Sequence, residues 1–207
     1  MAIARRDINP KQKEFFNEKA STWDQNIKHD HGKLDAIVDL LSLKPADTVL
    51  DVGTGTGITI PFLERRVGPS GRIVCVDYAE NMIKVAKRKF PAETYQNITF
   101  IVSDVNTIPI RSEYDAVLCY SCFPHFIDQL GTVAHLAKGL KPDGRLMVAH
   151  SQSRAAINKV HTESGEVVEK DYLPTMAELE EMMRSAGLRV GQRIDDSEKF
   201  VIVATRP

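Results

Sequence analysis

The chain has 207 residues, of which 43% are hydrophobic and 27% are charged. This balance fits a globular protein with one sizeable core and excludes a disordered chain. Lys plus Arg (27) nearly equals Asp plus Glu (28), and the resulting charge of -1 argues against a DNA- or RNA-binding protein, which usually carries a basic excess.

The lack of a recognisable targeting signal and the pattern of the cysteines favour a cytoplasmic location. The amino-terminal MAIARRD is charged but no apolar run follows it, and no stretch is long and apolar enough to span a bilayer. Cys75, Cys119 and Cys122 lie in or beside apolar runs, which predicts buried thiols in a reducing compartment. The Cys119–Cys122 spacing has no second cysteine pair, so it does not predict a zinc site.

The first part of the chain alternates helical and strand patterns. Residues 11–20 are polar and predict a helix, and apolar positions at helical spacing predict a second helix over 30–43. Pro45 ends that helix. The apolar run 48–52 predicts a buried strand, followed by a glycine-rich turn and a helix from about residue 57.

The same alternation continues to residue 150. Three further short apolar runs predict strands, and two amphipathic runs predict helices. The strands are expected over 72–77, 98–102 and 114–119, and the helices over 79–90 and 128–140. The segment LKPDGRLMVAH then predicts a turn and a strand that ends near His150.

The last quarter of the chain departs from this rhythm. Residues 151–173 are polar and weakly patterned, and we interpret them as an insertion on the substrate side. Thr175 and Glu178 have the spacing of a capping box that opens a helix. The apolar runs 188–194 and 200–205 are separated by an acidic turn and predict an antiparallel pair.

Strands that alternate with helices predict an α/β fold with a mostly parallel sheet and helices on both faces. The closing pair adds an antiparallel strand. The sequence contains no repeat, linker or low-complexity tract, so residues 1–207 are expected to form a single domain.

The turn after the first strand, in TVLDVGTGTGITI (residues 48–60), indicates a ligand site. A P-loop would need Lys and Ser or Thr after its last glycine, and Ile58 follows Gly57 instead. The dinucleotide pattern G-x-G-x-x-G fits poorly, because the third glycine comes one place early. The remaining interpretation is a nucleoside without a phosphate, which glycines allow to approach the backbone closely.

Acidic residues at three successive strand ends support a nucleoside. Asp51 precedes the turn and suits an ammonium group, and Asp77 ends the next strand and suits a ribose diol. Asp104 follows the third strand and could accept from an exocyclic adenine amine. In open α/β sheets ligands bind beyond the carboxyl ends of the strands, so all three acids are expected at the binding edge.

With these motifs, residues 16–205 resemble the class I S-adenosylmethionine-dependent methyltransferases. The matching segments are LDVGTGTG, VDYAENMIKVAK, SDV, YDAVLCYSCFPHF and GLKPDGRLMV. The resemblance implies a Rossmann-like seven-stranded sheet whose last strand is antiparallel, and S-adenosylmethionine as the cofactor. The expected cofactor-binding residues are Asp51, Gly53, Thr54, Gly55, Gly57, Asp77, Tyr78, Met82, Asp104, Val105 and Tyr120.

The segment FNEKASTWD is similar to the lid helix of the subgroup that includes ubiquinone and menaquinone biosynthesis methyltransferases. Residues 1–44 would then form a lid and helices, and residues 45–207 the core. The subgroup favours a small-molecule acceptor, with no nucleic acid and no membrane insertion. The oligomeric state stays open, with a homodimer as one option.

The resemblance implies direct, in-line transfer of the methyl group, for which the protein mainly aligns the reactants and excludes water. The family has no shared catalytic residue. At the end of the fifth strand, His150 is our candidate for a base or a group that orients the acceptor, although a hydrogen-bonded structural histidine is the plainer alternative. The candidate substrate-binding residues are Trp23, His125, Arg154 and His161.

Two alternatives remain open on sequence grounds. His125, His150 and His161 could together bind a metal, although their spacing is irregular and we expect none. The protein could also bind S-adenosylmethionine without turnover, as a sensor or a subunit of a complex.

Overall fold

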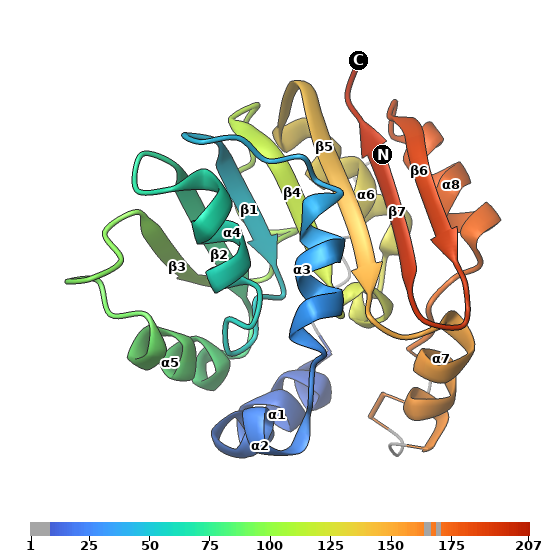
Figure 1. Cartoon of the computed structure of the whole chain (residues 1–207). Coiled ribbons are helices and arrows are strands. Elements are labelled where there is room, and N and C mark those ends of the chain that lie inside the picture. Colours follow the sequence, from blue (N-terminus) through green and yellow to red (C-terminus); the bar gives the residue numbers. More distant parts are fainter. Residues whose placement is uncertain (1–8, 164–166, 169–170) are drawn as a thin grey trace.

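The computed structural model describes residues 9–163, 167–168 and 171–207. Within them one seven-stranded sheet has the strand order β3-β2-β1-β4-β5-β7-β6 (Figure 1). Its strands are β1 (Thr48–Val52), β2 (Arg72–Asp77), β3 (Ile98–Val102), β4 (Tyr114–Tyr120), β5 (Leu140–His150), β6 (Arg189–Asp195) and β7 (Phe200–Thr205).

The sheet has the predicted mixture of strand directions. Strands β1 to β5 pair in parallel, whereas β7 runs antiparallel to both β5 and β6. Central strands such as β1 and β4 are apolar almost throughout because both faces of the sheet are covered. The predicted α/β fold with a last antiparallel strand is therefore confirmed.

Helices cover both faces of the sheet. The helices α3 (His31–Asp39) and α4 (Ile60–Val67) bury their apolar side chains on one face. The helices α6 (Gln129–Gly139) and α8 (Met176–Ser185) cover the other face, and α5 (Glu80–Lys89) packs against β2 and β3. None of the described helices is long and apolar enough to cross a membrane.

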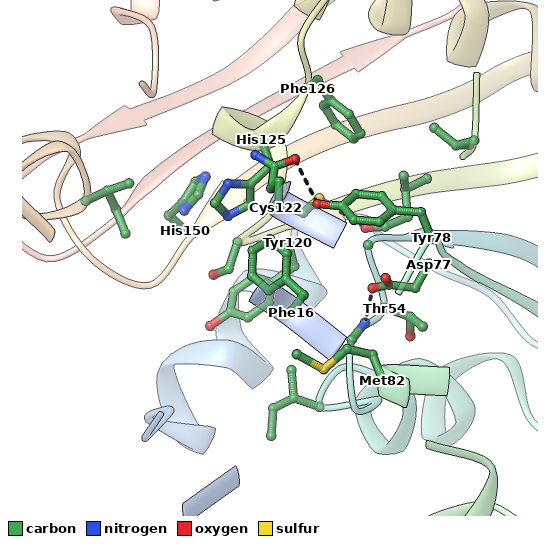
Figure 2. A pocket seen from close by; sticks show the side chains of 18 of the residues that line it. Phe16, Thr54, Asp77, Tyr78, Met82, Tyr120, Cys122, His125, Phe126 and His150 are labelled. Atoms are coloured by element: carbon green, nitrogen blue, oxygen red, sulfur yellow. Dashed lines mark hydrogen bonds between the residues drawn. The ribbon is translucent and has the colours of Figure 1, made fainter. Parts of the chain in front are cut away.

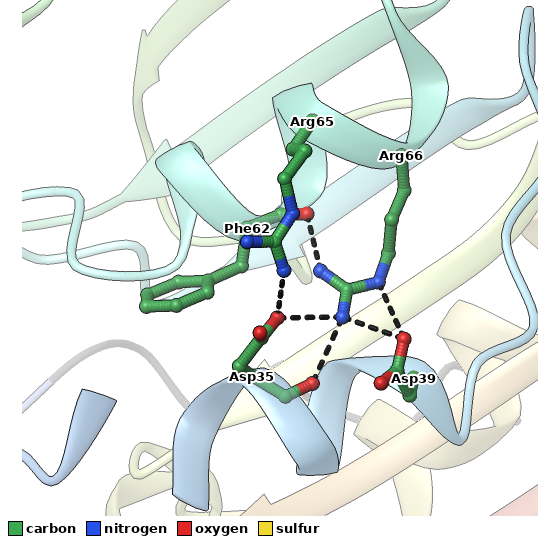
Figure 3. A network of polar contacts seen from close by, with 5 residues as sticks. All are labelled: Asp35, Asp39, Phe62, Arg65 and Arg66. Carbon is green, nitrogen blue, oxygen red and sulfur yellow. Dashed lines mark hydrogen bonds and ion pairs between the residues drawn. The ribbon is translucent and has the colours of Figure 1, made fainter. Parts of the chain in front are cut away.

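A charged network joins α3 to α4 at the surface (Figure 3). Arg66 donates to the carboxylates of Asp35 and Asp39 at 2.6 Å each, and to the backbone oxygens of Asp35 at 3.0 Å and Phe62 at 2.8 Å. Arg65 also contacts Asp35. Because the Arg66 side chain is only 12% exposed, this network is better shielded than an ordinary surface ion pair.

Most helix ends follow the sequence signals. Thr175 and Glu178 form the predicted capping box of α8. The helix after the glycine turn begins at Ile60 rather than near residue 57, because the turn extends through three glycines with positive φ. Pro61 lies in its first turn, where the missing N–H costs nothing.

The amino-terminal segment crosses the carboxyl ends of the strands (Figure 1). It contains α1 (Pro10–Lys19), the short helix η1 (Ala20–Thr22) and α2 (Trp23–Asn26). Residues 1–8 of the predicted lid lie outside the described residues.

The segment 151–173 contains a helix that the sequence pattern did not predict. This helix, α7 (Arg154–Glu163), has no fully buried residue, so it lacks the strong apolar stripe on which helix prediction depends. It lies at the same end of the sheet as α1 (Figure 1). Residues 164–166 and 169–170, which include Gly165, lie outside the described residues.

Candidate functional site

A cavity of about 830 Å³ lies at the carboxyl ends of the parallel strands. Its lining comes from the glycine turn, the ends of β2 to β5, the helices α1 and α2, and α7 (Figure 2). Strand ends meet at this edge, so residues far apart in the sequence share one cavity.

The glycine turn needs its glycines for two different reasons. Gly53, Gly55 and Gly57 all have positive φ, a conformation that side chains with a Cβ rarely adopt. A Cβ on Gly53 would stand 2.5 Å from the Cβ of Cys122. A Cβ on Gly55 would meet nothing within 4 Å, and Gly55 lines the cavity. At Gly55 the backbone is thus open to a ligand.

Asp77, at the end of β2, lies beside this turn. Its carboxylate accepts from the backbone N–H of Gly55 at 2.9 Å and of Ala79 at 2.8 Å. Burial raises the pKa of Asp77 to about 6, although the two backbone hydrogen bonds oppose the shift. Tyr78 and Met82, which follow it, also line the cavity (Figure 2). Asp77, Tyr78 and Met82 thus offer a carboxylate, an aromatic ring and a thioether, which suit contact with a nucleoside.

Two predicted cofactor residues lie behind the cavity wall. Asp51 is buried, and its carboxylate accepts from the hydroxyls of Thr54 and Thr59 at 2.6 Å each. Burial raises the pKa of Asp51 to about 6. A Cβ on Gly57 would meet Ile60, so this glycine serves packing. Neither Asp51 nor Gly57 is among the cavity-lining residues, and a direct ligand contact is not supported for them.

The third acid, Asp104, lines the cavity together with Val105 and Asn106. One oxygen of Asp104 accepts from the backbone N–H of Asn106 at 2.9 Å, which holds the carboxylate in place. The amide of Asn106 also donates to the hydroxyl of Thr132 at 3.0 Å, which ties the loop to α6. The predicted contact of Asp104 with the adenine amine stays a prediction.

Aromatic side chains of the amino-terminal helices cover the cavity. Phe16 contacts Trp23 edge to face, with ring centroids 5.7 Å apart, and approaches Tyr78 at 6.3 Å. Tyr120, at the end of β4, donates to the hydroxyl of Ser151 at 2.8 Å. These rings make part of the cavity apolar, which suits the exclusion of water.

Two of the predicted histidines, His125 and His161, both contact Asp171, which follows α7 in the sequence. The Nδ1 atom of His125 lies 2.7 Å from the Asp171 carboxylate, and Nδ1 of His161 lies 2.9 Å from the Asp171 backbone oxygen. The two imidazole rings are 5.0 Å apart. The structure therefore brings His125 and His161 together on the cavity wall.

The third histidine, His150, has a different environment. It is 1% exposed, it lines the cavity, and neither ring nitrogen has a hydrogen-bond partner among the described residues. Burial lowers the pKa of His150 to about 3, so the ring is neutral at physiological pH. A ring with so low a pKa is a poor general base, and the role of His150 in orienting the acceptor stays a prediction.

The structure also gives the positions of the other residues singled out in this region. Arg154 is not among the cavity-lining residues, and its charge lies near Tyr172 and Glu178, so its contact with the acceptor stays a prediction. Within the described residues no group of three or more His, Cys, Asp or Glu has an arrangement that could hold a metal ion. Cys75, Cys119 and Cys122 are free and buried.

Sequence reasoning missed the residues that hold the histidines in place. Gln12 is buried and donates to the Asp171 carboxylate at 2.7 Å, while its carbonyl accepts from the Tyr78 hydroxyl at 2.8 Å. A glutamine in a polar helix and an aspartate in a weakly patterned segment give no motif. Their contact depends on residues 159 positions apart, which only the fold brings together.

A family model and several curated relatives that match this chain are all methyltransferases. A family model described as a methyltransferase domain matches residues 49–144. The chain is 33% identical over 133 residues to a malonyl-[acyl-carrier protein] O-methyltransferase of Acetivibrio thermocellus, covering 63% of this chain and 46% of that protein. It is 27% identical over 174 residues to a ubiquinone/menaquinone biosynthesis C-methyltransferase of Vibrio campbellii, covering 72% and 67%.

A solved structure matches the fold. The crystal structure of an S-adenosylmethionine-dependent methyltransferase from Aquifex aeolicus superposes with a TM-score of 0.69 at 22% identity, covering 97% of this chain and 100% of that one. The chain spans about half the length of the first curated relatives it matches, 46% and 54% of them.

Proposed function

Because the chain belongs to the class I S-adenosylmethionine-dependent methyltransferases and is similar to their ubiquinone/menaquinone biosynthesis subgroup, we propose that it transfers the methyl group of S-adenosylmethionine to a small-molecule acceptor. The observation that carries this proposal is the contact of Asp77 with the Gly55 backbone inside the 830 Å³ cavity. It joins the carboxylate suited to a ribose to the turn that gives a ligand access to the backbone.

The lining residues support a division of the cavity into two ends. Gly53, Thr54, Gly55, Asp77, Tyr78, Met82, Asp104 and Val105 line what we assign as the cofactor end. His125, His150 and His161, with Trp23 and Tyr120, line the part that we assign to the acceptor. In this assignment Asp51 acts from behind, by fixing the hydroxyls of Thr54 and Thr59.

The proposed step is an in-line displacement. The acceptor nucleophile attacks the methyl carbon while the carbon–sulfur bond breaks and its electrons return to sulfur. The sulfonium is already activated, so the protein contributes mainly by aligning the two molecules and by excluding water. We assign residues 1–44 as the lid and helices and residues 45–207 as the core, and the contacts of Phe16 and Trp23 at the cavity support a lid at this place.

The free, buried cysteines fit a reducing compartment, which supports the cytoplasm as the place of this activity.

Isothermal titration calorimetry with S-adenosylmethionine tests the proposal first, and a search for methylated products among extracted metabolites tests it second. Absence of cofactor binding would refute both catalysis and the alternative of a cofactor-binding sensor. Binding without any methylated product would favour the sensor.

A further inference from the structure

The contact of His125 with a carboxylate assigns a hydrogen to its Nδ1 atom. A carboxylate only accepts hydrogen bonds, so in the 2.7 Å contact with Asp171 the hydrogen belongs to Nδ1 of His125. In a neutral ring with hydrogen on Nδ1, the Nε2 atom carries a lone pair. Nε2 of His125 has no hydrogen bond among the described residues, and His125 lines the cavity.

The carboxylate of Asp171 is itself held in place. The Asp171 oxygen that contacts His125 also accepts from Gln12 at 2.7 Å, and Gln12 accepts from the Tyr78 hydroxyl at 2.8 Å. This chain of contacts runs from Tyr78, next to Asp77 on the cavity wall, through Gln12 and Asp171 to His125. The side chains of His125 and Asp171 are only 15% and 16% exposed, so water competes weakly for the contact. The imidazole is therefore fixed before a ligand arrives.

A buried carboxylate behind an imidazole orients the ring and stabilises the imidazolium that forms when the ring takes a proton. Neither His150 nor His161 has this support among the described residues. Nδ1 of His161 contacts a neutral backbone oxygen, and His150 has no partner among the described residues. Among His125, His150 and His161, the carboxylate contact belongs to His125 in the described part of the chain.

We infer that His125 is the general base of the proposed methyl transfer, that Asp171 and Gln12 are its positioning residues, and that the acceptor presents a neutral nucleophile that still carries its proton. This inference rests on the proposed function. In the step, the lone pair of Nε2 takes the proton of an acceptor X–H group. The bonding electrons stay on X, which attacks the methyl carbon, and the carbon–sulfur electrons return to sulfur.

The products of this step balance. They are X–CH3, S-adenosylhomocysteine and an imidazolium paired with Asp171, which later releases its proton to solvent. An acceptor that is already ionised, such as a carboxylate, needs no base.

Phe16 packs edge to face on His125, with ring centroids 5.0 Å apart, and Phe126 and Ile157 line the same cavity. These neighbours favour an acceptor whose hydroxyl stands on a flat, apolar body, as in a phenol.

The first test measures the tautomer of His125. In the full chain bound to S-adenosylhomocysteine, ¹⁵N-histidine NMR should show hydrogen on Nδ1 and a lone pair on Nε2 of His125. The Asp171→Asn variant keeps an oxygen acceptor but loses the charge, and should lower the preference for this tautomer. Hydrogen on Nε2 in the unaltered protein would contradict the inference.

The second test uses 4-nitrophenol, a phenol whose ionised form is visible by its absorbance. Added to the S-adenosylhomocysteine complex at a pH where free 4-nitrophenol is mostly neutral, it should show the phenolate band on binding. His125→Gln and Asp171→Asn should each reduce this band at least tenfold. Asp171→Glu should restore part of it, and His31→Gln, which changes an exposed histidine of α3, should leave it intact.

The outcomes separate this inference from the proposed function. Calorimetry on the same variants should give S-adenosylhomocysteine affinities within twofold of the unaltered protein, which shows that the fold and the cofactor end are intact. Cofactor binding with no phenolate band, whether the phenol fails to bind or fails to ionise, would overturn the inference alone. Binding of one equivalent of Zn²⁺ that is lost in both His125→Gln and His161→Gln would overturn it too, because the rings would then be metal ligands.

Discussion

The carboxylate of Asp77 accepts a hydrogen bond from the backbone N–H of Gly55 at 2.9 Å. This contact joins the end of β2 to the turn after β1, and it leaves lone pairs of the carboxylate available for a ligand. A ribose diol would donate two hydrogen bonds to such an acceptor.

Asp77→Asn should therefore weaken S-adenosylmethionine binding. The amide keeps one acceptor oxygen but loses the charge, and hydrogen bonds to charged groups contribute about 1.5–3 kcal/mol, so we expect a loss of at least about tenfold in affinity. Calorimetry measures it. Asp115→Asn is the matched control, because Asp115 lies at the start of β4, at the opposite end of the sheet, and bonds the Thr48 backbone and Lys141. Equal losses in both variants would contradict the assignment of Asp77.

Cofactor affinity should also depend on pH in the mildly acidic range. Burial raises the pKa of Asp77 to about 6, and only the ionised form accepts hydrogen bonds with all its lone pairs. Affinity should be constant above that pKa and should fall by about tenfold for each pH unit below it. Calorimetry from about pH 5 to about pH 8 gives the profile. A profile in Asp77→Asn as steep as that of the unaltered protein would assign the effect elsewhere, with Asp51 as the next group to test.

Gly53 and Gly55 of the turn should respond differently to alanine. Gly53→Ala places a Cβ 2.5 Å from the Cβ of Cys122 at a φ of 64°, so strain and overlap together should cost about 2–5 kcal/mol of unfolding free energy. Gly55→Ala adds a Cβ in open space at a φ of 55°, which should cost only about 1–2 kcal/mol. Urea unfolding measures both. In Gly55→Ala the loss should instead be in cofactor affinity, because Gly55 lines the cavity.

The contact between α3 and α4 gives a prediction of stability alone. Arg66 bonds two carboxylates and two backbone oxygens with the fork of its guanidinium (Figure 3). Arg66→Lys keeps the charge but cannot make all these contacts, so we expect a loss of about 1–3 kcal/mol in urea unfolding. Arg65 is 60% exposed, and Arg65→Lys should change stability by less than about 0.5 kcal/mol. Similar losses in both variants would mean that the Arg66 fork adds nothing.

The sheet and the cofactor end could be predicted because they depend on local patterns. Parallel strands place their carboxyl ends together, so an acid at the end of each strand is sufficient to predict where Asp77 and Asp104 lie. The position of a residue at a strand end does not predict whether its side chain faces the cavity or the protein interior. Asp51 turns into the protein, toward Thr54 and Thr59, because the hydroxyls of the turn and its helix offer hydrogen bonds there.

The acceptor end could be predicted only in part, because it depends on tertiary contacts. His125 and His161 were identified as residues, but their relation through Asp171 was not, since Asp171 lies in a segment without periodicity. The helix α7 was missed for a related reason. It lies on the cavity rather than in the core, and its side chains carry too little burial to leave an apolar stripe.

The histidine His150 gives a final prediction that separates stability from function. Its ring is buried with both nitrogens unpartnered among the described residues, and a buried polar group without a hydrogen bond costs about 1–3 kcal/mol. His150→Leu, which is apolar, should therefore raise the unfolding free energy at neutral pH by about 1–2 kcal/mol. If the ring orients the acceptor, the same variant should lose acceptor binding.

The pH dependence of this effect has a definite sign. Burial lowers the pKa of His150 from 6.5 to about 3, so below pH 6.5 the unfolded chain takes a proton that the folded chain does not. This site therefore loses stability as pH falls, by about 1.4 kcal/mol per unit until the folded pKa is reached. Urea unfolding of His150→Leu should show a shallower loss toward acid than the unaltered protein, whereas His31→Leu, at an exposed position, should not. Lower stability of His150→Leu at neutral pH, with an unchanged acid slope, would mean that the ring has a hydrogen-bond partner in solution.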